Sequence, residues 1–211
     1  MTIVGVILTI ENSYRALNRL IIYRRWRMPQ TQILVALCGC QFTGKTTIGD
    51  RLREILGIPF VAVDRLRPLL FGPSRMYVGN RELDDFQLSR AYPAMAGVVE
   101  RLLTLGESLI VEGTFSRQDY QQEVLVDLPG RYGIKTRTIL LEIPDEKTLS
   151  VVRERAESRR NGNDPSAATT IDDYLRVKER FEPLVVPHLR VDTTEPLETC
   201  LSRILDYLKQ A

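Results

Sequence analysis

Five short apolar runs, rich in β-branched residues, alternate along the chain with segments in which apolar residues recur at helical spacing. Strands that are apolar throughout and separated by helices are typical of a parallel sheet covered on both faces. The pattern therefore predicts an α/β fold with three layers around a five-stranded parallel sheet. The predicted strands are residues 33–38, 59–63, 108–112, 137–143 and 189–192.

Two of the intervening helices have predicted ends. The first begins near Lys45 and stops at Gly57, two residues before Pro59. The second lies at the C-terminus, with Thr194 as its expected N-cap and Pro196 in its first turn. Apolar residues at i, i+4, i+7 and similar spacings mark the buried faces. These residues are Ile48, Leu52, Ile55 and Leu56 in the first helix, and Leu197, Leu201, Ile204, Leu205 and Leu208 in the second.

Residues 1–30 do not fit the alternation and are interpreted as an N-terminal extension of uncertain role, with one domain over 31–211. The extension holds five arginines and one acid, so its net charge is +4. Because the whole chain has a net charge of +2, the remaining residues together carry about −2. Ser13 could cap a helix that continues to about Trp26. A membrane-surface helix is one interpretation, and a non-essential extension is the preferred one.

Composition narrows the class of protein. The chain has 211 residues, 44% apolar and 27% charged, as in ordinary soluble domains. A net charge of +2 gives no electrostatic reason to expect nucleic acid. Three cysteines form no disulfide framework, which fits a reducing cytoplasm. No run reaches the ~18 apolar residues of a membrane span, and the ten residues MTIVGVILTI lack the flanks of a signal peptide.

The segment GCQFTGKT at residues 39–46 matches the phosphate-binding loop pattern G-x-x-x-x-G-K-[ST] between a predicted strand and a predicted helix. Gly39 and Gly44 permit backbone angles and close approach that side chains would block. Loop amides and the helix N-terminus would then bind a polyphosphate. Lys45 would reach the β- and γ-phosphates of ATP and the Thr46 hydroxyl would ligate Mg²⁺. The remaining nucleotide-contacting positions are Cys40, Gln41, Phe42, Thr43 and Thr47.

Other motifs favour a small phosphotransferase over other nucleotide-binding classes. No N-K-x-D guanine motif is present, and the chain is too short for a ring-forming ATPase. The strand at 59–63 is followed by Asp64, at the sheet edge where open α/β folds bind ligands. Asp64 could accept the proton of a substrate hydroxyl, or only cap the next helix. Arg67, one turn later, could hold an anionic substrate group.

Two further segments add charged candidates. The strand at 108–112 ends in Glu112, an acid placed to hold Mg²⁺ or its waters beside Thr46. Arg117, which follows, would touch substrate or solvent. Arg155 and Arg159 share one helix face and could close over ATP, where they would stabilise charge on the transferred phosphoryl group. A solvated basic face is the alternative for this pair.

The motifs GCQFTGKTT, VDRLR, LIVEGTF, RERAESRR with DPSAA, and YLRVKERFEP together resemble the small P-loop kinases over about residues 32–210. The chain is most similar to predicted kinases related to the kinase domain of bacteriophage polynucleotide kinase, and more distantly to gluconate and shikimate kinases. The resemblance implies strand order 2-3-1-4-5, a helical lid at about residues 155–170, a magnesium–ATP donor and a hydroxyl acceptor.

The resemblance also implies individual roles. Asp64 matches the general base, Arg67 the arginine that binds the acceptor's phosphate, and Arg159 the lid arginine with Arg155 as its partner. Thr193 and Thr194 lie where these kinases enclose the adenine. The sequence departs from the family in two places: Glu112 replaces a frequent Asp, and residues 65–95 match no subfamily pattern.

Three functions therefore stay open. The first is ATP-dependent phosphorylation of a hydroxyl on a small metabolite. The second is a polynucleotide or nucleoside 5′-hydroxyl kinase, supported by the Asp64–Arg67 pair and by arginines 65, 67, 75, 81 and 90. Nucleic acid is not favoured, because the main body has no net positive charge and no evident aromatic stacking platform, although Tyr77 and Tyr92 could serve as one. The third is a nucleotide-binding switch that hydrolyses ATP without transfer. His188, the sole histidine, is expected to be structural.

Overall fold

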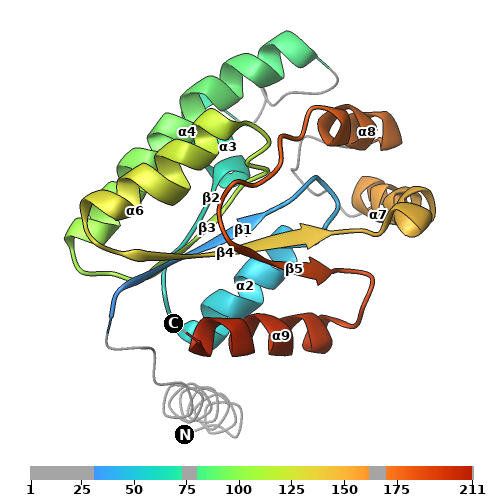
Figure 1. Cartoon of the computed structure of the whole chain (residues 1–211). Coiled ribbons are helices and arrows are strands. Elements are labelled where there is room, and N and C mark those ends of the chain that lie inside the picture. Colours follow the sequence, from blue (N-terminus) through green and yellow to red (C-terminus); the bar gives the residue numbers. More distant parts are fainter. Residues whose placement is uncertain (1–30, 73–79, 162–169, 211) are drawn as a thin grey trace, which may run out of the picture.

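The five predicted strands form one parallel sheet in the order β2-β3-β1-β4-β5 (Figure 1). This computed structural model describes residues 31–72, 80–161 and 170–210. All four neighbouring pairs are parallel, and β1 lies in the centre between β3 and β4. The strands are β1 Ile33–Cys38, β2 Phe60–Ala62, β3 Leu109–Glu112, β4 Lys135–Glu142 and β5 His188–Asp192.

Helices cover both faces of the sheet, as the continuously apolar strands require. On one face, α4 (Arg81–Thr104) and α6 (Leu128–Arg131) pack over alternate β1 residues such as Leu34 and Ala36 (Figure 1). On the other face, α2 (Lys45–Leu56) and α9 (Leu197–Lys209) pack over Ile33, Val35 and Leu37. The two apolar clusters confirm the predicted three-layer α/β/α architecture.

The remaining described helices either lie around the carboxyl edge of the sheet or continue into α6, which packs on the same face of the sheet as α4. A single helical stretch contains α5 (Gln118–Gln121), a π-helical segment (Gln122–Asp127) and α6. At the edge lie α3 (Val63–Phe71), a 3-10 turn (Asp145–Lys147), α7 (Thr148–Asn161) and α8 (Ile171–Glu179) (Figure 1). Because every strand is parallel, the loops after all five strands meet at this one edge.

Most predicted boundaries hold, and one cap was wrong. The helix from Lys45 ends at Gly57, which takes the left-handed conformation (φ 66°) expected of a glycine cap. The last helix has Pro196, not Thr194, at its N-cap position. The helix begins at Leu197, two residues later than the cap at Thr194 requires, and the Thr194 hydroxyl and amide both donate to the Asp192 carboxylate, at 2.7 and 2.8 Å.

Part of the predicted organisation lies outside the described residues. This applies to the extension at 1–30 and to residues 162–169 of the predicted lid, whereas the helix that leads into the lid is α7. Within the described ranges, no helix combines the length and apolarity needed to cross a membrane. His188 begins β5 and its Nδ1 lies 2.8 Å from the Val186 carbonyl oxygen, which fits a structural role.

Candidate active site

The loop between β1 and α2 has the backbone that its two glycines predict. Gly39 has φ 144°, and a Cβ atom there would overlap the Leu141 carbonyl oxygen of the neighbouring strand. Gly44 has φ 74° and is the N-cap of α2, so the helix begins at Lys45 with its free amides facing the loop. Gly39 therefore requires glycine and the left-handed conformation of Gly44 favours it, and the geometry suits the binding of an anion.

The loop is closed by contacts to one carbonyl group. The Lys45 ammonium (Nζ) and the Thr43 hydroxyl each donate to the Cys40 carbonyl oxygen at 2.8 Å. Burial raises the pKa of the Cys40 thiol, and Lys45 partly counteracts that rise. The buried Oε1 of Gln41 has no hydrogen-bond partner among the described residues, and Thr47 is exposed in the first turn of α2.

Phe42 anchors the loop from its middle. Its φ is 63°, which is uncommon for a residue other than glycine, and its side chain is buried. The ring belongs to a separate small apolar cluster between the loop and helices α7 and α8. The buried members of this cluster are Phe42, Ile143, Val152, Ala156 and Tyr174. The phosphate-binding loop is thus packed directly against the helices that lead into and out of the predicted lid.

Arg155 makes a second link between α7 and the loop. Its guanidinium donates to the Phe42 carbonyl oxygen and to the Thr193 carbonyl oxygen, each at 2.6 Å. Thr193 also donates through its amide to the Glu142 carbonyl oxygen at 3.0 Å. The Thr194 hydroxyl accepts from Lys147 at 3.1 Å. Arg155 therefore joins the phosphate-binding loop to the segment where the resemblance expects adenine.

Thr46 and Glu112 lie side by side, as the two motifs suggested. The Thr46 hydroxyl is 3.2 and 3.3 Å from the two carboxylate oxygens of Glu112. Glu112 is buried, and burial raises its pKa to about 7; the negative charge of Asp64 adds to the rise, while Lys45, the Thr46 hydrogen bond and Arg65 oppose it.

This pair fits a magnesium site. The described residues contain no cluster of three or more His, Cys, Asp or Glu side chains that could hold a metal. Mg²⁺ is commonly bound by one or two protein oxygens together with waters and substrate phosphates. The Thr46 hydroxyl at the start of α2 and the Glu112 carboxylate at the end of β3 supply such oxygens beside the phosphate-binding loop.

Asp64 lies in the first turn of α3, two residues after β2. The N-cap of this helix is Ala62, so the interpretation of Asp64 as only a helix cap was wrong. Its side chain is 44% exposed, and its charge acts on Glu112. The carboxylate is thus accessible at the sheet edge, near the Thr46–Glu112 pair.

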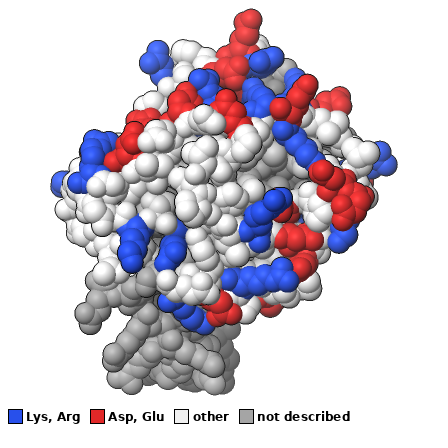
Figure 2. Space-filling view, viewed as in Figure 1, with Lys and Arg blue, Asp and Glu red and all other residues white. Residues whose placement is uncertain are grey.

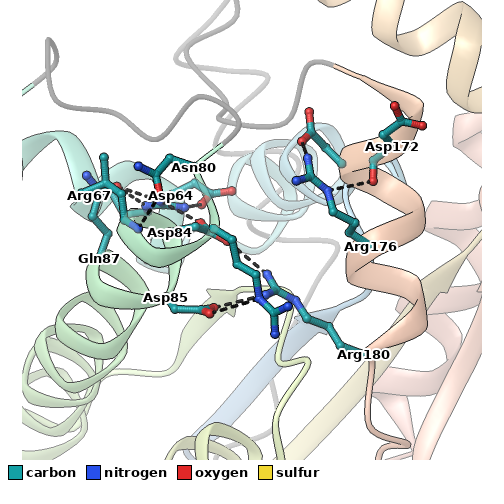
Figure 3. A network of polar contacts seen from close by, with 12 residues as sticks. Asp64, Arg67, Asn80, Asp84, Asp85, Gln87, Asp172, Arg176 and Arg180 are labelled. Carbon is teal, nitrogen blue, oxygen red and sulfur yellow. Dashed lines mark hydrogen bonds and ion pairs between the residues drawn. The ribbon is translucent and has the colours of Figure 1, made fainter.

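Arg67 shares the Asp64 face of α3, as its spacing predicted, but its side chain is only 3% exposed. One of its nitrogens lies 3.7 Å from Asp64 (Figure 3). Its other contacts come from α4: an ion pair with Asp84 at 3.0 Å and a hydrogen bond to Gln87 at 2.7 Å. Arg180, which caps the C-terminus of α8, binds the second oxygen of Asp84 at 3.1 Å.

Arg117 lies outside this network of Asp64, Arg67, Asp84 and Arg180, and Tyr92 cannot have the role suggested for it. Arg117 is the N-cap of α5 and makes an exposed ion pair with Asp119 at 2.8 Å. Tyr92 is fully buried, stacked on Tyr120 and bonded through its hydroxyl oxygen to the Phe115 amide at 2.8 Å, so it cannot serve as a stacking platform for a base. Tyr77 and the side chain of Arg159 lie outside the description.

Sequence reasoning missed Asp84, Gln87 and Arg180. They lie on α4 and after α8, 17 to 116 residues from Asp64 and Arg67 along the chain, and belong to no motif. The only local signal is that Asp84 is one of two acids in the first turn of α4, a common helix feature.

A sequence profile for a family described as an AAA domain, AAA_33, matches residues 34–184. The chain belongs to this family. The matched region contains the phosphate-binding loop, Asp64, Glu112 and α7, so it covers the site described above. A search of curated proteins gave no match.

Several solved structures of similar fold are described as kinases. A protein of Chloroflexus aurantiacus J-10-fl, provisionally described as a kinase, is 26% identical, with a TM-score of 0.67 over 86% of this chain and 98% of that chain. A sugar kinase of Janibacter sp. HTCC2649 is 20% identical (TM-score 0.62, 85% and 96% covered). A gluconokinase of Sinorhizobium meliloti 1021 is 16% identical (TM-score 0.58, 88% and 94% covered). The fold and the resemblance to small P-loop kinases are confirmed.

Proposed function

We propose that this protein is a kinase that transfers the γ-phosphoryl group of ATP to a hydroxyl group of a small metabolite. The observation that carries the proposal is the position of Asp64. Its half-exposed carboxylate lies at the carboxyl edge of the sheet, close enough to Glu112 to act on its titration. A carboxylate beside a phosphate-binding loop suits the deprotonation of an attacking hydroxyl.

The other residues act on the donor. The amides of residues 39–47 and the ammonium of Lys45 bind the β- and γ-phosphates of ATP. The Thr46 hydroxyl and Glu112 would hold Mg²⁺, directly or through water, and the ion would supply positive charge against these phosphates. Arg155 fixes the loop to the segment of Thr193 and Thr194, which encloses the adenine. Arg159 stabilises charge on the phosphoryl group during transfer.

The acceptor reaches Asp64 from solvent, on the side of α3 and α4. Arg117 is proposed to line the outer part of this route because it is exposed at the start of α5. The three free cysteines are consistent with a protein of the reducing cytoplasm, where ATP and magnesium are abundant.

Transfer of ³²P from [γ-³²P]ATP to a panel of sugars, polyols, nucleosides and 5′-hydroxyl oligonucleotides tests the proposal. We expect Asp64→Asn to lower the turnover number about 10²-fold or more while ATP affinity stays within about threefold. Asp206→Asn, the same change at an exposed position of α9, is the matched control and should leave both quantities unchanged. An Asp64→Asn enzyme with wild-type turnover would refute the role of the base. Release of phosphate to water alone would favour the ATPase switch instead.

A further inference from the structure

The arginine that lies one turn after the proposed base has its charge compensated by the protein itself. Arg67 is 3% exposed, and its guanidinium contacts the Asp84 carboxylate and the Gln87 amide oxygen (Figure 3). Gln87 is bound twice, by Nε at 3.2 Å and Nη2 at 2.7 Å. A buried cation with a bonded carboxylate and amide has little capacity left for a substrate anion.

The compensating carboxylate is itself held from two sides. One oxygen of Asp84 contacts Arg67 at 3.0 Å and the other contacts Arg180 at 3.1 Å. Arg180 also pairs with Asp85 at 3.1 Å. Asp85 also pairs with Arg81 at 3.7 Å, so the network of Asp64, Arg67, Asp84, Asp85, Arg180 and Arg81 contains as many carboxylates as guanidinium groups. A phosphate or carboxylate on a substrate would therefore meet no uncompensated guanidinium in this network that could offset the loss of its hydration.

Three other described arginines on the acceptor side also have their charge compensated by a carboxylate. Arg65 pairs with Asp50 at 2.6 Å, Arg81 with Asp85 at 3.7 Å, and Arg117 with Asp119 at 2.8 Å. The guanidinium of Arg90 lies over the Phe86 ring, 5.7 Å from its centre. On the face shown in Figure 2, basic and acidic side chains of the described residues are interspersed and form no continuous basic tract. A polynucleotide backbone needs such a tract for affinity.

We propose that the acceptor of this kinase is an uncharged hydroxyl compound, without phosphate or carboxylate, and that the Asp84–Arg67 pair excludes anionic analogues. The proposal rests on the proposed function and specifies its substrate class. It also replaces the role expected for Arg67: in place of binding an anion on the acceptor, the arginine supports Asp64 from behind at 3.7 Å, with Asp84 and Gln87 holding it in position.

The test compares matched acceptors that differ by one anionic group: sorbitol against gluconate, glucose against glucose 6-phosphate, and adenosine against adenosine 3′-monophosphate. With the full-length protein, [γ-³²P]ATP and Mg²⁺, we expect every acceptor that is phosphorylated to be the neutral member, with kcat/KM at least tenfold above its anionic partner. Preference for an anionic member, or for a 5′-hydroxyl oligonucleotide, overturns this inference and leaves the kinase function intact. Transfer to no acceptor at all overturns both.

Two variants then locate the effect. Asp84→Asn removes the charge that compensates Arg67, so the ratio of neutral to anionic kcat/KM should fall at least tenfold. Asp85→Asn makes the same change at the adjacent residue, which contacts Arg180 and Arg81 and not Arg67. For Asp85→Asn, the ratio of neutral to anionic kcat/KM should stay within twofold of the wild-type ratio. Equal ratios for the two variants refute the part assigned to Asp84. Should Asp84→Asn not fold, as judged by circular dichroism, the wild-type comparison alone decides.

Discussion

Glu112 carries a stability cost that depends on pH. Its pKa is raised from 4.5 to about 7 in the folded protein, because the carboxyl is buried and lies near Asp64. Between these two values the folded protein retains a proton that the unfolded chain has released. The folded state therefore binds more protons, and the free energy of unfolding must fall as pH rises from about 4.5 to 7.

The magnitude follows from the shift. One pKa unit corresponds to about 1.4 kcal/mol, so the ionised carboxylate costs about 3 kcal/mol above pH 7 and under about 1 kcal/mol at pH 5. Glu112→Gln has nearly the same shape and stays neutral, so it avoids this cost. We expect the free energy of unfolding of the variant to exceed that of wild type by about 3 kcal/mol at pH 8. At pH 5 this difference should be smaller by about 2 to 3 kcal/mol. The variant should bind Mg²⁺–ATP more weakly, since a carboxylate oxygen at the Thr46 hydroxyl is gone.

The assay is urea unfolding followed by far-UV circular dichroism at pH 5 and pH 8, with EDTA and without nucleotide. Glu123→Gln is the control, because it makes the same change on the exposed side of the π-helical segment. Its difference from wild type should change much less between the two pH values. The reasoning would be refuted if the stability difference between Glu112→Gln and wild type were the same at pH 5 and pH 8, or if the variant were the less stable protein at pH 8.

Two further predictions concern the loop and the lid. Phe42→Ala should lower the free energy of unfolding by about 3 to 5 kcal/mol in urea titrations, since the buried ring joins the phosphate-binding loop to α7 and α8; a loss under about 1 kcal/mol would show that this cluster contributes little. Arg159→Ala should reduce turnover about tenfold or more and change ATP affinity under about threefold, with exposed Arg153→Ala as the control. Equal losses in turnover and affinity would make Arg159 a ligand of bound ATP in the ground state.

The residues that could be predicted from sequence are those whose role is set by a short stretch of backbone. Gly39 and Gly44 predict a loop because their positive φ angles favour glycine. The apolar runs predict a parallel sheet because both faces are buried. Glu112 could be placed beside Thr46 because Glu112 ends one strand and Thr46 follows the loop after its parallel neighbour, at the same edge of the sheet. Thr194 was placed wrongly as a cap, since the choice between Asp192 and the helix amides depends on a local turn.

Tertiary structure alone decided how the charges pair. The sequence determined the order of strands and helices, the phosphate-binding loop and the position of Asp64 after β2, because each depends on neighbours within a few residues. It did not determine that Asp84 would meet both Arg67 and Arg180, which come together only when α3, α4 and the end of α8 converge at the sheet edge. From a motif one can predict that an arginine is present near the site. Whether its positive charge is available to a substrate depends on which carboxylate the fold brings next to it.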